Sequence, residues 1–171
     1  DFWGEGYAKV GIEAIKDAGF QGVCFDIELT KGEAELTDAF ERAFAACKQA
    51  GLLVMVTTSH SAPYAAASVS QKLAIVDAWA ESENIDIFSP QLYTTGVEEE
   101  PEFAITQCGN TLEKERTCTY ERLKKMKAKW VPSLSWASHY PAAKKFFAEK
   151  GITTHGFIEW GVTKDGNDGD A

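Results

Sequence analysis

The chain has 171 residues, 44% of them hydrophobic and 12% aromatic, which is enough apolar material for one domain with a sizeable core. Its formal net charge of -9 disfavours binding to the phosphate backbones of nucleic acids and to anionic lipids, so we expect neither nucleic acid nor membrane as a partner. No apolar stretch approaches the ~20 residues that span a bilayer, and no signal-type segment follows Asp1, so we expect a mature form or a missing beginning.

Helical and strand patterns alternate along the whole chain. In chain order they predict helix 7–18, strand 22–29, helix 37–50, strand 52–58, helix 70–82, strand 85–93, helix 120–127, strand 130–136, helix 142–150 and strand 154–162. Three of the helices are expected to stop at glycines, namely Gly19, Gly51 and Gly151. The strands look buried on both faces, which indicates a parallel α/β sheet with helical crossovers. An open doubly wound sheet and a TIM barrel both remain possible, and in either fold function collects where strands end.

Two carboxylates lie two residues apart on the first predicted strand. Because strand side chains alternate between faces, Asp26 and Glu28 must point the same way, together with Cys24. The opposite face is apolar and is expected to pack on helices through Val23, Phe25 and Ile27. Two acids on one enclosed face push each other's pKa apart, which general acid catalysis requires.

The four cysteines form no CxxC pair, and no histidine follows at ligand spacing, so we expect no metal site. Cys108 and Cys118 bracket a polar segment and form either a disulfide of a secreted domain or two free thiols of a cytosolic one; we expect the disulfide and a secreted protein. Cys24 and Cys47 are expected to be reduced, small core residues. The three histidines are expected at the surface: His60, His139 and His155.

The stretch from Gly19 to Glu28 resembles the DGxDxDxE strand of glycoside hydrolase family 18, the chitinases and related endo-acting N-acetylglucosaminidases. Three later segments are similar to the family's fifth, sixth and eighth strands: 52–58, the QxY element in 89–93, and 156–160, which ends in a tryptophan. The resemblance implies a partial TIM barrel of about five βα units over residues 1–164, corresponding to strands four to eight, followed by an acidic Gly/Asp tail over 165–171. Five strands cannot close an eight-stranded barrel, so a missing N-terminal segment or another chain is expected to complete it.

The same resemblance implies a mechanism on β-1,4-linked N-acetylglucosamine, as in chitin or related glycans. Glu28 would protonate the glycosidic oxygen while the substrate's own acetamido carbonyl attacks the anomeric carbon. Asp26 would orient the acetamido group, Tyr93 would hydrogen-bond its oxygen, and Trp160 would form the floor under the sugar. Substrate binding is also assigned to Gln91, Trp136 and Cys24. Neither a metal nor another cofactor is implied.

The sequence departs from the family pattern at Gln21 and Cys24, where the family usually carries acids. The inner of these acids normally shares a proton with the acid at the position of Asp26, and a neutral thiol cannot do so. One alternative is therefore a carbohydrate-binding or structural protein that kept the sugar groove and lost turnover. A further alternative is an unrelated barrel enzyme in which Asp26 and Glu28 hold a divalent metal.

Overall fold

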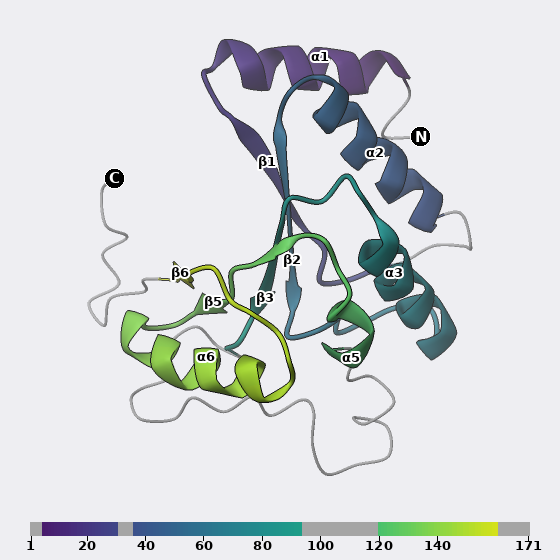
Figure 1. Cartoon of the computed structure of the whole chain (residues 1–171). Helices are drawn as coiled ribbons and strands as arrows, with labels where there is room; N and C mark the ends of the chain where they lie inside the picture. Colours follow the sequence, from purple (N-terminus) through teal and green to yellow (C-terminus); the bar gives the residue numbers. More distant parts are fainter. Residues whose placement is uncertain (1–4, 31–35, 94–119, 161–171) are drawn as a thin grey trace.

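The computed structural model describes residues 5–30, 36–93 and 120–160, with side chains of the first helix described from Gly11 onward (Figure 1). The first part of the chain forms α1 Glu5–Asp17, β1 Gly22–Asp26, α2 Leu36–Gln49, β2 Leu53–Ser59, α3 Val69–Glu81 and β3 Ile87–Gln91. The second part forms α5 Tyr120–Leu123, β4 Lys129–Trp130, β5 Ser133–Leu134, a 3-10 turn Ala137–His139, α6 Tyr140–Glu149 and β6 Ile158–Glu159. The predicted alternation of helices and strands is confirmed.

The strands form one sheet in which every described pairing is parallel. Their order is β1-β2-β3-β5-β6, and the short β4 also lies beside β3. This order follows the chain without reversal, whereas a doubly wound sheet reverses at a switch point. The sheet curls into a half-barrel (Figure 1), so the barrel-type alternative is the one that the chain adopts.

The helices cover one side of this sheet, and the other side is its concave face. On the helical side, the Phe25 ring of β1 meets the Phe44 ring of α2 at 5.0 Å between centroids. Val54 and Val56 of β2 are fully buried on that same side. The apolar face predicted for the first strand is thus confirmed. Polar side chains, Asp26 among them, take the alternate positions on the concave face.

Aromatic rings fill much of the core between the sheet and the helices of the second part of the chain. The Phe88 ring lies 4.9 Å from the Trp130 ring, and the fully buried Tyr120 ring lies 5.3 Å from that of Phe147 in an edge-on arrangement. Such pairs contribute about 0.5–1.5 kcal/mol each beyond the area they bury. These contacts hold α5 and α6 against the helix-covered side of β3 and β4.

Helix ends follow the chemistry expected of them. Gly19, Gly51 and Gly151 have φ angles of 84°, 81° and 75°, in the left-handed region that glycine occupies at low cost, and each follows a helix as predicted. At the N-terminus of α3, the Ser68 hydroxyl accepts a hydrogen bond from the Gln71 amide at 3.1 Å.

Some predicted elements are shorter or differently buried than expected. The strand predicted over 130–136 is split into β4 and β5 at Pro132, which has no N–H to donate. The helix predicted over 120–127 is the four-residue α5. The expectation that strands are buried on both faces is wrong for β1, because no described residue covers the concave face of this edge strand and Cys24 and Asp26 are exposed.

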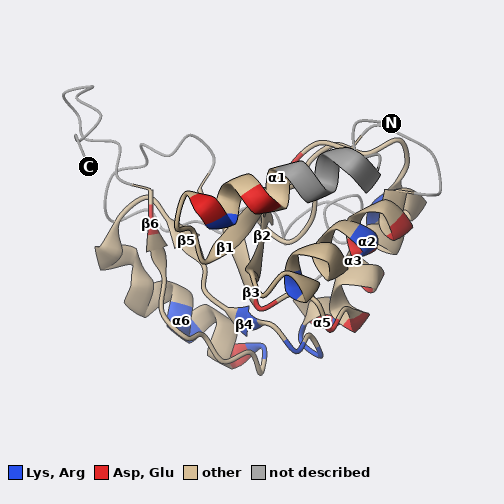
Figure 2. Cartoon of the chain, turned by 90° about the horizontal axis from the view of Figure 1, so that it is seen from above, with Lys and Arg blue, Asp and Glu red and all other residues tan. Residues whose placement is uncertain are grey.

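Charged residues of both signs are interspersed over the helices (Figure 2). The Lys124 ammonium pairs with Glu121 at 2.5 Å, and Lys127 pairs with Glu83, so these members of the basic run form ion pairs at the surface. Among the described helices, none combines the length and the apolar character needed to cross a bilayer.

Candidate functional site

The residues singled out by the sequence lie around one edge of the sheet. Asp26 is the last residue of β1, Gln91 is the last residue of β3, and Trp160 directly follows β6. Glu28 and Tyr93 lie two residues beyond the ends of β1 and β3. Because all the strands are parallel, these carboxyl-terminal ends meet at the same edge, which is where barrel enzymes carry their chemistry.

Asp26 and Glu28 interact directly. The Glu28 carboxyl group lies close enough to Asp26 to affect its ionisation, and the Gln91 amide nitrogen lies 3.2 Å from Asp26 Oδ1. Partial burial and the neighbouring Glu28 raise the pKa of Asp26 above its usual range, while the hydrogen bond from Gln91 acts in the opposite direction.

A row of buried hydroxyl groups lies beneath this pair on the concave face. Thr57 of β2, in register with Asp26, donates to the Ser89 carbonyl at 2.8 Å. The Ser89 hydroxyl in turn lies 2.7 Å from that of Ser133 on β5. Thr57, Ser89 and Ser133 are 8%, 0% and 6% exposed, so these bonds are shielded from water. They tie three neighbouring strands together directly below the carboxylates.

The loop after β2 is fastened to the chain around Glu28. Leu29 and Ala65 form a parallel bridge, and the Thr30 amide donates to the Ala65 carbonyl at 2.9 Å. The loop begins at His60, whose φ of 46° is rarely adopted by residues other than glycine. The Glu28 backbone is therefore held from both sides, by its own strand and by this loop.

Two aromatic side chains stack at the same edge. The rings of Tyr93 and Trp160 lie 6.1 Å apart between centroids with 24° between their planes. Trp160 is 53% exposed, and its amide donates to the Leu134 carbonyl at 2.7 Å, which anchors it to β5. An exposed indole held in this way offers the apolar face on which sugar rings stack. Trp136, also proposed for substrate binding, is half-buried and lies just beyond β5 at the start of the 3-10 turn.

The two described cysteines are both free. Cys47 is buried in α2 as predicted. Cys24 is exposed on the concave face, so its prediction as a core residue is wrong, because nothing among the described residues covers that side of the edge strand. Partial burial and the charge of Asp26 raise the pKa of the Cys24 thiol, so it is neutral at pH 7. The predicted bond between Cys108 and Cys118 lies outside the described residues.

The prediction of surface histidines is wrong for two of the three. His60 is 1% exposed and His139 is 6% exposed. His60 follows β2, and its amide donates to the Gln91 carbonyl of β3, while His139 ends the 3-10 turn before α6. A turn-like sequence pattern therefore does not imply exposure. Sequence reasoning also missed Thr57 and Ser89 as parts of the site, and their inward alternation with buried valine and phenylalanine was the available signal.

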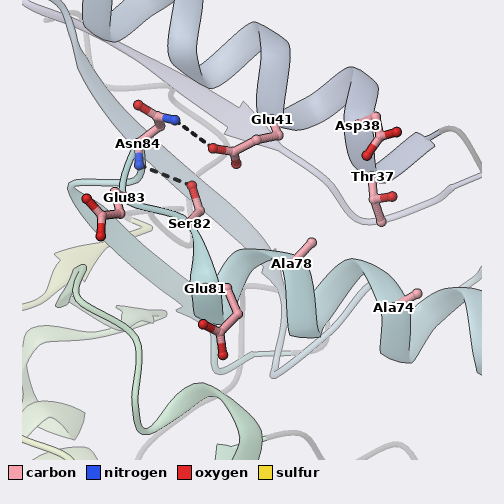
Figure 3. A pocket seen from close by; sticks show the side chains of 9 residues that line it. All are labelled: Thr37, Asp38, Glu41, Ala74, Ala78, Glu81, Ser82, Glu83 and Asn84. Carbon is pink, nitrogen blue, oxygen red and sulfur yellow. Dashed lines mark hydrogen bonds between the residues drawn. The ribbon is translucent and has the colours of Figure 1, made fainter.

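A hollow of about 450 Å³ lies elsewhere, between α2 and α3 (Figure 3). Its walls are largely acidic or small: Thr37, Asp38, Glu41, Ala74, Ala78, Glu81, Ser82, Glu83 and Asn84. The Asn84 side chain donates to Glu41 at 2.6 Å across it. These helices cover the opposite side of the sheet from Asp26, so the hollow is separate from the candidate site. The candidate site lies on the concave face, where the Asp26 carboxyl group lies close to that of Glu28.

The described residues contain no group of three or more histidine, cysteine or acidic side chains arranged to hold a metal ion. A scan against models of known protein families finds no match to this chain, and a search of curated proteins finds none either. Function must therefore be inferred from the site itself.

Proposed function

We propose that the protein is a glycoside hydrolase of the family 18 type, acting on β-1,4-linked N-acetylglucosamine in chitin or related glycans. One arrangement carries the proposal: a neighbouring pair of carboxyl groups, Asp26 and Glu28, at the carboxyl-terminal edge of a half-barrel that also bears the stacked Tyr93 and Trp160. Paired acids supply the proton for glycoside cleavage, and exposed aromatic rings supply the surface for a sugar.

The proposed reaction is retaining and substrate-assisted. Glu28 gives its proton to the glycosidic oxygen as the bond from that oxygen to the anomeric carbon breaks, and the acetamido carbonyl oxygen of the same sugar bonds to that carbon. The resulting oxazolinium ion carries a positive charge, which the Asp26 carboxylate stabilises. Water then attacks the anomeric carbon, gives a proton back to Glu28 and restores the acetamido group. Each step uses only the substrate, water and these two carboxyl groups.

A second candidate is a carbohydrate-binding protein without turnover. The observation that favours it is Cys24, whose neutral thiol lies on the concave face next to Asp26 where the family carries an acid. Under this alternative the aromatic pair would still bind sugar, while the proton relay through Asp26 would be incomplete.

The deciding experiment compares Glu28→Gln with the unaltered protein on a chromogenic N-acetylglucosamine oligomer. The amide cannot donate the proton but fills the same space, so we expect cleavage to fall by about 100- to 10,000-fold while oligomer binding, followed by Trp160 fluorescence, persists. The matched control is Glu121→Gln on the exposed surface of α5, which should leave the rate unchanged.

The substrate supplies a second test. A deacetylated oligomer has no carbonyl oxygen to attack the anomeric carbon, so it should bind without being cleaved. Full activity of Glu28→Gln would contradict the proposal. Binding by the unaltered protein with no cleavage at any pH would establish the carbohydrate-binding alternative instead, and the absence of both binding and cleavage would contradict both candidates.

A further inference from the structure

Gln91 makes two hydrogen bonds whose direction the structure determines. Its amide nitrogen lies 3.2 Å from Asp26 Oδ1 and 3.3 Å from the Thr57 hydroxyl oxygen. The Thr57 hydroxyl has one proton and donates it to the Ser89 carbonyl at 2.8 Å. Thr57 can therefore only accept from Gln91, which orients the amide with its NH₂ group toward both Thr57 and Asp26.

The backbone of Gln91 is also fixed. It ends β3, in register with Ser59 on β2 and Ser133 on β5, and its carbonyl accepts from the His60 amide at 3.0 Å. From this position the side chain reaches over β2 to the end of β1. Neighbouring strands lie ~4.8 Å apart, so the inward curl of the sheet helps one side chain to bridge three strands.

A donor aimed at Asp26 affects the ionisation of its carboxyl group. An N–H group that bonds a carboxylate favours its ionised form, so the bond from Gln91 opposes the burial and the neighbouring Glu28 that raise the pKa of Asp26. The described titratable groups that face Asp26 are Cys24 from its own strand and Glu28, two residues beyond it. The neighbouring strands present Thr57 and Gln91 to it, and neither of these ionises.

We propose that Gln91 is a positioning residue whose amide group holds the Asp26 carboxyl group in place and favours its ionised form. Gln91 thus acts through the Asp26 carboxylate, in addition to or in place of the sugar contact expected from the sequence. The inference rests on the proposed hydrolase function for its kinetic consequence, but the hydrogen bonding to Asp26 can be tested without turnover.

The test replaces the amide with an apolar side chain of similar length, Gln91→Met. The first readout is the titration of the Asp26 carboxyl carbon by ¹³C NMR, assigned with Asp26→Asn, and we expect its midpoint to move to higher pH. The second is the pH profile of kcat/KM, whose acidic limb should move upward by the same amount. At pH values below the new midpoint, the rate would fall ~tenfold whenever the limb moves by one pH unit, with little change in KM at higher pH.

Two further variants make every outcome decisive. Gln49→Met, on the exposed surface of α2, is the matched control and should leave both readouts unchanged. Gln91→Asn is one methylene shorter, keeps a polar side chain should the methionine variant unfold, and should move the Asp26 titration in the same direction. An unchanged Asp26 titration in the Gln91 variants would overturn the inference, whether or not the protein is an enzyme. An altered titration in a protein that cleaves no oligomer would support Gln91 and reject the hydrolase.

Discussion

The buried hydroxyl group of Tyr120 leads to a prediction about stability. Tyr120 is fully buried among the rings of Trp130, Phe146 and Phe147, and its hydroxyl has no hydrogen-bond partner within the described parts of the chain. Burial accordingly raises its pKa far above the ordinary value. A buried polar group without a partner costs about 1–3 kcal/mol of folding free energy, because it gives up its hydrogen bonds to water.

Removing that oxygen should therefore stabilise the protein. Tyr120→Phe keeps the ring and its edge-on contacts, so we expect the free energy of unfolding to rise by about 1–3 kcal/mol. For a chain of this size that corresponds to a Tm increase of roughly 2–12 °C. Urea unfolding followed by circular dichroism and differential scanning calorimetry would measure the two quantities independently.

The matched control is a tyrosine whose hydroxyl is satisfied. The Tyr140 hydroxyl lies 3.0 Å from that of Thr154 and accepts from the Gly156 amide at 3.2 Å. Tyr140→Phe should consequently lower stability by about 1 kcal/mol, the opposite sign for the same chemical change. Equal effects of the two substitutions, or a lower Tm for Tyr120→Phe, would refute the reasoning from hydrogen-bond satisfaction.

Two further predictions concern β1. Gly22→Ala would place a Cβ atom 2.7 Å from the backbone oxygen of Leu53, so it should reduce stability in urea unfolding by about 1–3 kcal/mol. The control is Gly11→Ala in α1, whose Cβ atom would meet no atom within 4 Å, so it should be neutral or stabilising. Equal effects of the two substitutions on stability would show that the contact with Leu53 is unimportant. Asp26→Asn should become more stabilising relative to the unaltered protein as pH rises. The raised pKa of Asp26 means that the native state binds its proton more tightly than the unfolded chain does, so stability is present below the unfolded pKa and lost as pH rises through the folded pKa. Measuring the Tm of both proteins from pH 3 to pH 7 checks this. If the Tm of Asp26→Asn fell relative to that of the unaltered protein toward neutral pH, the prediction would be contradicted.

Much of the fold could be predicted because its signals are local. Alternation of polar and apolar residues identified the faces of β1, and glycines marked the helix ends at Gly19 and Gly51. The order of the strands in the sheet is not a local property, so the sequence pattern left the doubly wound sheet and the barrel equally open. The break at Pro132 could have been predicted, since proline cannot donate to a sheet ladder. The apolar residues on both sides of Pro132 instead favoured one continuous strand.

The candidate site was only partly accessible to sequence reasoning. Strand alternation predicted a shared direction for Asp26 and Glu28, but β1 ends at Asp26 and Glu28 lies in the bend that follows it. The bond from Gln91 to Asp26 does not, because it depends on the curvature that brings β3 over β2 toward β1. Burial of His60 was missed for a related reason: the turn that carries it folds back onto the sheet edge, and that packing involves residues distant in sequence.

The agreement between strand order and chain order has a consequence for folding kinetics. Thr58 bonds the Ile27 carbonyl across 31 residues, Thr57 bonds the Ser89 carbonyl across 32, and Ser89 meets Ser133 across 44. The entropy of closing a loop grows only with the logarithm of its length, so the longest of these closures costs just about 0.3 kcal/mol more than the others. Each βα unit needs only its immediate predecessor as a template, and the sheet can grow by successive addition of neighbours. Insertions in the crossovers would consequently slow its assembly very little.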